Sequence, residues 1–194
     1  MQRCGAGLHN RVNAMAQHSQ HDSATQLGSI NSDDFACNVA VFMHGRSKFK
    51  FVDGEYDGEW KGGFRHGDGT FRFNDGDVYE GKFSHDLKHF RGKYTHANGA
   101  TYDGQWVRNR KHGTGRQEWP NGDVYEGNFA NDKRHGFGSM VYANDGKFSL
   151  AGSDFSWSAG DRFDGLFQHD VRHGACSYRF FNGETFTGTW VKGR

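Results

Sequence analysis

Aromatic and polar residues alternate along much of this chain. Between Tyr56 and Trp60, the residues Tyr56, Gly58 and Trp60 alternate with Asp57 and Glu59. A period of two places alternate side chains on opposite faces of a β-strand, so the rings share one face and the charges the other. Glycine at such short intervals would cost a helix about 0.5–1 kcal/mol per position relative to alanine. The pattern therefore predicts strands and not helices.

The same five-residue phrase returns along the chain at a regular interval. It consists of an aromatic residue, any residue, glycine, any residue and a second aromatic residue. Successive copies start 23 residues apart, except for one interval of 38 residues. Six copies at one period indicate a repeat architecture in which each unit is one supersecondary element. The copies start at Tyr56, Tyr79, Tyr102, Tyr125, Phe163 and Phe186.

A second phrase follows each copy and predicts the return strand. Arg65-His66-Gly67 is followed by the strand-like run Gly69–Phe73, and similar phrases recur in the other units, although Phe90 replaces the glycine once. Asn-Gly or Asp-Gly dipeptides close the units, and they supply the positive φ that tight strand connections need. We expect one β-hairpin per unit, with Arg65-His66-Gly67 in the loop between its strands. The closing dipeptides are Asp75-Gly76, Asn98-Gly99, Asn121-Gly122, Asp145-Gly146 and Asn182-Gly183.

Together these phrases, Tyr-x-Gly-x-Trp/Phe and then Arg/Lys-His-Gly-x-Gly, closely resemble the MORN (membrane occupation and recognition nexus) repeat. The resemblance covers residues 56–194 and extends to a degenerate copy around His44-Gly45, Phe49 and Phe51. It implies an all-β fold, an elongated single-layer antiparallel meander of tandem 23-residue β-hairpin repeats (a MORN solenoid) with a groove along one face. Similar family members occur in cilia and flagella, at cortical cytoskeletons, with myosin tails and at membrane junctions. Such repeats are also attached to lipid kinases and a lysine methyltransferase.

The expected domain organisation has three parts. Residues 1–34 contain no aromatic residue, and we expect a flexible N-terminal tail. Residues 35–55 form the degenerate half repeat, and residues 56–194 form the repeat array. An insertion at about residues 148–162 breaks the period and alternates enough to form a hairpin. Such an insertion is either a tolerated surface loop or a contact for a partner.

Composition narrows the class of protein. An aromatic content of 15% beside 29 glycines favours strands whose rings lie over bare backbone. With 24 basic and 23 acidic residues there is no strong electrostatic field, so we expect no nucleic-acid partner. No apolar run approaches the roughly 18 residues of a membrane span, and no signal peptide is visible. We therefore expect a cytoplasmic protein that is neither secreted nor membrane-spanning, and the family resemblance implies association with the cytoskeleton or a cilium.

Residues that could carry chemistry are accounted for by their repeat positions. Cys4, Cys37 and Cys176 are too few and too scattered for a disulfide or zinc framework. Cys176 takes the place of a repeat glycine and should be a small buried thiol, whereas Cys4 could carry a lipid but has no myristoylation signal near it. One histidine per unit is too widely spaced to share a tetrahedral metal ion. We expect no catalytic residue, no metal and no cofactor; the histidines are His66, His89, His112, His135 and His173.

The repeated rings form the first candidate site. Any one of them could simply be core, but a single-layer sheet cannot cover both of its faces. We therefore expect some rings to remain accessible and to receive a helical or extended segment of a protein partner. The residues of this predicted groove are Tyr56, Trp60, Tyr79, Phe83, Tyr102, Trp106, Tyr125, Phe129, Phe163 and Phe167, and the ladder continues to Phe186 and Trp190.

A row of cations along one edge of the sheet forms a second, weaker candidate site. One arginine or lysine precedes the histidine of each unit, and spaced cations could bind acidic phospholipid, above all phosphoinositide, or an acidic peptide. A row of acidic residues, which includes Asp57 and Asp164, could instead pair with these cations and brace the strands. The cations are Arg65, Lys88, Lys111, Arg134 and Arg172.

The sequence thus predicts a non-catalytic scaffold that binds a protein partner along an aromatic groove, in a cytoskeletal, ciliary or flagellar assembly. A phosphoinositide-dependent membrane tether and a trans-acting regulatory subunit of an enzyme are the alternatives. The segment Thr187–Val191 would form an exposed edge strand. Because exposed edges invite pairing with another chain, a homodimer through this strand is a further expectation.

Overall fold

The computed structural model describes residues 43–150, 153–191 and 193. These residues contain fourteen strands and no helix, so the predicted all-β antiparallel class is confirmed. No helix within them is long and apolar enough to cross a membrane. The tail predicted at residues 1–34, with Cys4, and the later Cys37 lie outside the described residues. The chain divides into two compact units, Met1–Leu87 and Lys88–Arg194.

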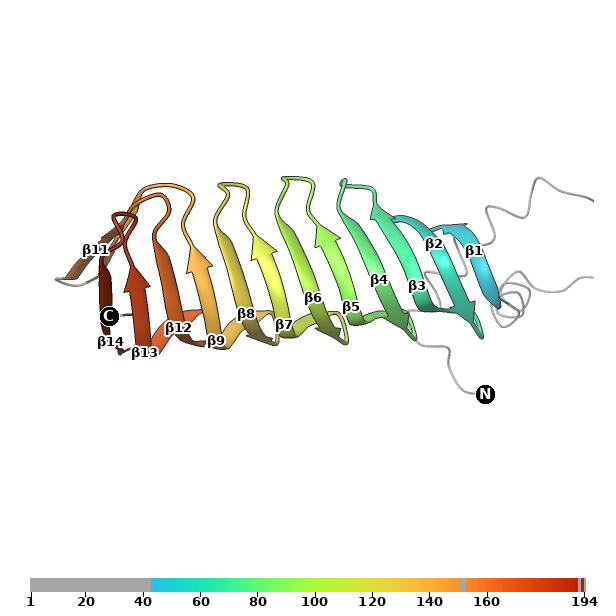
Figure 1. The fold of residues 1–194 in the computed structure, drawn as a ribbon. Coiled ribbons are helices and arrows are strands. Elements are labelled where there is room, and N and C mark those ends of the chain that lie inside the picture. The colour runs from blue at the N-terminus through green and yellow to red at the C-terminus, as the bar shows by residue number, and fades with distance from the viewer. Residues whose placement is uncertain (1–42, 151–152, 192, 194) are drawn as a thin grey trace, which may run out of the picture. The chain divides into compact units, whose positions relative to one another are not determined.

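The first unit is an antiparallel meander in which each strand pairs with the next one in the chain (Figure 1). Its strands are β1 (Gly45–Lys50), β2 (Gly54–Lys61), β3 (Phe64–Phe73) and β4 (Val78–Ser84). The pairing of β1 with β2 is continuous from Gly45 opposite Trp60 to Lys50 opposite Glu55. The segment around His44 and Phe49 therefore contributes a full strand partner to the first complete hairpin.

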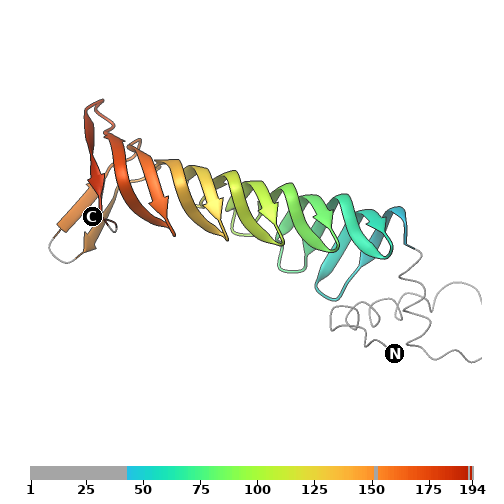
Figure 2. The same ribbon diagram turned by 90° about the horizontal axis from the view of Figure 1, so that it is seen from below.

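The second unit repeats this meander and adds a separate hairpin. The meander strands pair in the order β5-β6-β7-β8-β9-β12-β13-β14, while β10 and β11 pair only with each other. In Figure 2 the orange strands β10 and β11 stand apart from the row of meander strands. The bounds are β5 (Leu87–Thr95), β6 (Thr101–Val107), β7 (Arg110–Glu118), β8 (Val124–Ala130), β9 (Lys133–Val141), β10 (Gly146–Leu150), β11 (Ser153–Trp157), β12 (Arg162–Gln168), β13 (Val171–Arg179) and β14 (Thr185–Trp190).

The insertion lies within the turn that connects β9 to β12, and the residues on either side of it keep the backbone contacts of an ordinary turn. The N–H of Tyr142 donates to the carbonyl oxygen of Asp161 at 3.0 Å, as the N–H of Trp119 donates to that of Asp123 at 2.9 Å. Strands β9 and β12 therefore pair in register across the insertion. The turn expected at Asp145-Gly146 is displaced, because Gly146 begins β10 and Gly160, with φ of 90°, takes the turn position.

Facing glycines explain how one layer of strands builds a core. Gly104 on β6 pairs with Gly115 on β7, and the ring of Tyr102 lies over this pair. A Cβ on Gly104 would come within 2.6 Å of both the Gly115 Cα and the Tyr102 hydroxyl oxygen. The same arrangement recurs at Tyr56 and Tyr125. The rings therefore pack on bare backbone, as the glycine and aromatic content predicted.

The connection within each hairpin differs from the prediction. Arg65-His66-Gly67 lies inside β3, and the turn is Gly62-Gly63 instead. Gly67 has φ of 59° and lies in a β-bulge, where the register between β2 and β3 shifts. Its positive φ therefore serves a bulge and not a turn, and both uses favour glycine. The matching turns later in the chain, whose residues all have positive φ, are His85-Asp86, Arg108-Asn109, Asn131-Asp132 and His169-Asp170.

Candidate functional site

The ten residues of the predicted groove are all buried. Each is at most 4% exposed, because the rings cover one another edge to face. The centroid of the Tyr125 ring lies 5.1 Å from that of Phe129 and 5.2 Å from that of Phe167. Of the predicted ladder, only its continuation is accessible in the described residues: Phe186 is 57% exposed and Trp190 is half-buried, whereas the ten groove residues are covered. Their contribution to partner binding stays a prediction, and any direct contact must involve other side chains on the same face.

The tyrosine hydroxyls of this core are satisfied by backbone. Tyr102 donates to the carbonyl oxygen of Gln105 at 2.8 Å, and Tyr125 donates to that of Asn128 at 2.9 Å. Burial raises the pKa of Tyr125 to about 12, and burial likewise raises the pKa of Tyr102. These phenols therefore remain neutral at physiological pH. The carbonyl groups that accept their hydrogen bonds lie beside the β-bulges, so the hydrogen bonds stabilise the bulged backbone.

The predicted cation row lies over the rings and not along an edge of the sheet. In the first unit, the guanidinium carbon of Arg65 is 5.0 Å from the centroid of Phe71. In the second unit, that of Arg134 is 5.0 Å from Phe167. Burial lowers the pKa of Arg65 and of Lys111. At Lys111 the effect of burial outweighs that of the carboxylates of Asp132 and Asp170, which raise the pKa. We call the face that carries these rings and cations the aromatic side.

Turn residues bind these cations, and the sequence analysis did not identify them. Asp86 Oδ1 accepts from the backbone N–H of Arg65 at 3.0 Å and from its Nε at 3.2 Å. Asp170 makes the same two contacts with Arg134, at 2.9 and 3.2 Å. Asn109 and Asp132 accept from the N–H groups of Lys88 and Lys111 at 2.7 and 2.8 Å. The sequence does contain a pattern that could have identified these turn residues. In three units the Asp or Asn follows the cation by 21 residues.

The acidic row proposed as a partner for these cations makes other contacts. Asp57 pairs with Arg46 at 3.4 Å, and Asp164 pairs with Arg162 at 2.8 Å. Both acids alternate with the buried residues of their strands, so they lie on the face opposite the aromatic side. The two rows therefore do not brace each other.

A second set of rings is accessible on the aromatic side. Phe51 and Phe73 in the first unit and Tyr94 and Trp119 in the second unit are half-buried. Cations lie against three of them: Arg65 is 5.3 Å from the Phe51 centroid, the Lys88 Nζ is 4.4 Å from that of Tyr94, and Arg134 is 5.7 Å from that of Trp119. We call Phe51, Phe73, Tyr94 and Trp119 the outer rings. The aromatic side thus offers partly exposed rings next to positive charge.

The histidines remain near their turns. His66 lies 5.7 Å from His85, and His135 lies 5.1 Å from His169, measured between ring centroids. Within residues 43–150, 153–191 and 193, no group of three His, Cys, Asp or Glu residues is placed to hold a metal ion. Cys176 is buried at 8% exposure, as its glycine-like position predicted.

Comparison with known proteins adds two findings. The family model described as "MORN repeat" matches residues 56–78, 79–101, 102–124, 125–147 and 163–185, which is more than half of the chain. Among solved structures, the chain is similar to the SAS-4 (dCPAP) TCP domain of Drosophila melanogaster in complex with a proline-rich motif of Ana2 (dSTIL). That match has 14% identity and a TM-score of 0.38, and it covers 87% of this chain and 98% of the other.

Proposed function

Because this chain belongs to the MORN repeat family, a family of non-enzymatic repeats, we propose that it is a scaffold that binds a segment of another protein on its aromatic side. The buried ladder supplies rigidity, and the outer rings with their cations supply the contact surface. A cytoskeletal, ciliary or flagellar assembly, the setting implied by the family resemblance, is part of the same proposal.

One observation carries this proposal: accessible aromatic rings and positive charges lie together on one face of the strands. In the second unit, the Lys88 Nζ lies 4.4 Å from the Tyr94 centroid and 4.5 Å from that of the buried Trp106. Tyrosine and tryptophan are enriched at protein–protein contacts, because they provide a large contact area at a small cost in conformational entropy. A segment with apolar and acidic residues matches this surface.

The test compares two faces of the same strands. The partner is first recovered by affinity capture and identified by mass spectrometry, and its binding segment is then produced alone. The dissociation constant of that segment is measured for Tyr94→Ser with Trp119→Ser, and for Val107→Ser with Phe137→Ser on the opposite face. Val107 and Phe137 are 40% and 58% exposed, so neither pair removes a buried side chain.

We expect the double variant on the aromatic side to weaken binding by roughly tenfold or more, because aromatic side chains at an interface often carry much of the binding energy. The double variant on the opposite face should leave binding unchanged. Circular dichroism and thermal melting confirm that both variants are folded. Equal binding by the two variants would contradict the proposal. The core substitutions Trp106→Ser and Phe129→Ser are unsuitable, since both side chains are only 3% exposed.

The cation row supports the membrane alternative less well. Arg65 and Arg134 are held by the carboxylates of Asp86 and Asp170, which offset their charge. A phosphoinositide tether should bind vesicles that contain phosphatidylinositol bisphosphate and lose that binding steeply with added salt. Such binding, in the absence of any effect of the outer-ring variants, would favour the tether over the protein partner. A regulatory subunit of an enzyme would be one case of the proposed partner binding, with the enzyme as the partner.

A further inference from the structure

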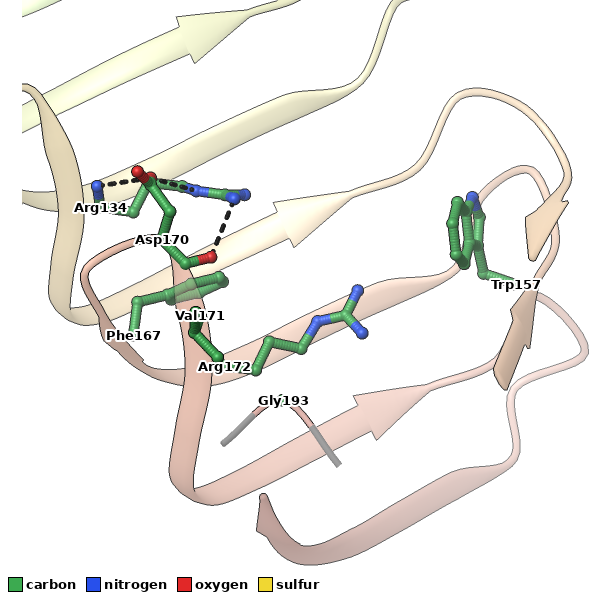
Figure 3. A pocket seen from close by; sticks show the side chains of 7 residues that line it. All are labelled: Arg134, Trp157, Phe167, Asp170, Val171, Arg172 and Gly193. Carbon is green, nitrogen blue, oxygen red and sulfur yellow. Dashed lines mark hydrogen bonds and ion pairs between the residues drawn. The ribbon is translucent and has the colours of Figure 1, made fainter. Parts of the chain in front are cut away.

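The strand β14 has one open edge in the part of the chain that the structure describes. It pairs with β13, and no described strand lies on its other side. The chain turns after β14 as it does after β12, because the N–H of Gly193 donates to the carbonyl oxygen of Arg172 at 3.0 Å. The N–H of Asp170 makes the same contact with Arg134 at 3.0 Å, and Figure 3 shows these residues at the two turns. Gly193 therefore lies toward β13 and not along the outer edge of β14.

The exposure of Phe186 shows the effect of this open edge. Its counterparts in the same unit, Tyr102, Tyr125 and Phe163, are completely buried, because each lies on a strand with neighbours on both sides. Phe186 lies against Gly188 as those rings lie against their glycines, yet it is 57% exposed. A further strand on the open edge would cover this ring.

The sequence of β14 is symmetrical about Gly188. Phe186 and Trp190 are both aromatic, and Thr187 and Thr189 are identical. Two antiparallel copies of β14 can therefore pair with Gly188 opposite Gly188 and with each threonine opposite a threonine. In the same register, Phe186 of one copy lies opposite Trp190 of the other. The strand is thus complementary to itself.

Facing glycines are also the arrangement by which the repeats pack a ring on backbone. Gly104 pairs with Gly115, and the ring of Tyr102 lies over both. Gly188 opposite Gly188 of a second copy reproduces this pair, with Phe186 in the place of Tyr102. Opposed threonines and opposed aromatic residues are favourable cross-strand pairs as well. The pairing of two copies therefore repeats contacts that already build the core of the chain.

Charge distinguishes β14 from the end strand of the first unit. Edge strands commonly avoid pairing by means of charged residues or proline, and β14 contains neither. Strand β1, which pairs only with β2 among the described strands, carries Arg46, Lys48 and Lys50. Two antiparallel copies of β1 would bring these cations together, whereas two copies of β14 bring no charges together.

We propose that β14 pairs with β14 of a second copy of this chain, antiparallel and centred on Gly188, in a two-fold symmetric homodimer. Such a contact uses the same residues on both copies, and the sheet continues from one copy into the other. This arrangement gives a register to the homodimer expected from the sequence. It is independent of the proposed partner binding, although a dimer would carry the aromatic side twice.

The test places charges at the two threonines. In the proposed register, Thr187 of each copy lies opposite Thr189 of the other. Thr187→Lys with Thr189→Lys therefore opposes lysine to lysine, whereas the matched control, Thr187→Lys with Thr189→Glu, opposes lysine to glutamate. Both threonines are exposed, and their neighbours on β13 are Ser177 and Ala175, so we expect both variants to fold. Thermal melting checks the fold.

Sedimentation equilibrium of the full chain and of the two variants measures the dissociation constant of the dimer. We expect roughly 10–100 µM for the original chain, as for a small transient contact. The lysine–lysine variant should dimerise roughly tenfold more weakly, because like charges directly opposite each other destabilise paired strands. The lysine–glutamate variant should stay within about threefold of the original chain, because its opposed charges attract.

A chain that remains monomeric throughout this concentration range would overturn the proposal. Equal weakening in the two variants, or no weakening in either, would place the contact in another register or on another surface and overturn it as well. Oligomers larger than a dimer would overturn the two-fold contact in favour of pairing between β14 and β1 of different copies. The outer-ring variants test the proposed function separately, because neither Tyr94 nor Trp119 lies on β14.

Discussion

The ring of Tyr125 lies against Gly138, where a Cβ would come within 2.5 Å of the ring carbons Cε2 and Cζ. The hydroxyl of the same tyrosine is also among the atoms that this Cβ would meet. In the fifth unit the corresponding residues are Phe163 and Cys176, so the ring lacks the hydroxyl and the facing residue has a Cβ. The phenol oxygen and the Cβ thus compete for one space.

This competition predicts a coupled pair of substitutions. Gly138→Ala should lower the free energy of unfolding by about 1–3 kcal/mol, the usual cost of overpacking. Tyr125→Phe should cost about 1 kcal/mol, because it removes the hydrogen bond to the Asn128 carbonyl. Gly138→Ala should cost less in the Tyr125→Phe background, since the hydroxyl is gone. Urea denaturation of the four proteins measures the coupling, and strictly additive losses would contradict it.

The turn carboxylate of Asp170 should stabilise the chain mainly through backbone. Asp170→Gly tolerates the φ of 72° and removes the acceptor of the Arg134 N–H, so we expect a loss of about 1–3 kcal/mol. Asp170→Asn should cost less, because Asn109 accepts from the Lys88 N–H in the same geometry. Chemical denaturation checks both variants. If asparagine costs as much as glycine, the ion pair and not the backbone contact is the stabilising element.

Phe90 is predicted to destabilise the strand that contains it. It adopts φ of 59° at a position where the other units have Gly67, Gly113, Gly136 or Gly174, and its side chain is 60% exposed. Phe90→Gly should therefore raise the free energy of unfolding by about 1 kcal/mol, because the left-handed conformation costs about that much with a Cβ. Phe137→Gly is the control, since Phe137 is 58% exposed but has no positive φ. Phe137→Gly should lower the free energy of unfolding. If Phe90→Gly also lowers it, Phe90 is not strained.

Asp161 should make stability depend on acid pH. Burial opposes its ionisation, but hydrogen bonds from the Ser158 N–H, the Tyr178 hydroxyl and the Phe181 N–H outweigh burial and lower the pKa of Asp161 below 3.8. A carboxyl whose pKa is lowered by folding contributes stability that is fully present above its ordinary pKa of 3.8 and is lost as the pH falls through the folded value.

Asp161→Asn should therefore destabilise the chain by about 1–3 kcal/mol near neutral pH, and the difference from the original chain should shrink below the ordinary pKa. Urea unfolding across this pH range measures the difference. A difference that stays constant down to acid pH would show that the charge of Asp161 is not the cause.

The sequence predicted the strands, the face of each strand that carries the rings, and the packing of rings against glycine. The first two depend on the local alternation of residues, and the third depends on the space that a missing side chain leaves. The alternation of Tyr56, Gly58 and Trp60 with charged residues decides which face is buried, and burial of these three residues confirms it. The displacement of the turn from Gly67 to Gly62-Gly63 could not be predicted in this way. Positive φ suits glycine in a bulge as well as in a turn, so glycine alone does not distinguish them.

The burial of the ten groove rings was not predicted either, although Phe186 of the same ladder is 57% exposed. A single layer can cover the rings on one of its faces when those rings lie flat over glycine backbone. The Tyr56 ring lies over Gly58 and Gly69, with Trp60 and Phe83 packed against it at 5.2 and 5.1 Å. The contact of a turn aspartate with the cation one repeat earlier was also missed, because it joins residues that are adjacent only after the hairpins pair.

The most direct test of partner binding on the aromatic side is hydroxyl-radical footprinting of the chain with and without its captured partner segment. Oxidation is read by mass spectrometry at single side chains and needs no substitution. We predict that the partner protects Tyr94 and Trp119 from oxidation and leaves Phe137, on the opposite face, unprotected. Protection of Phe137 with unchanged oxidation of Tyr94 and Trp119 would contradict the account.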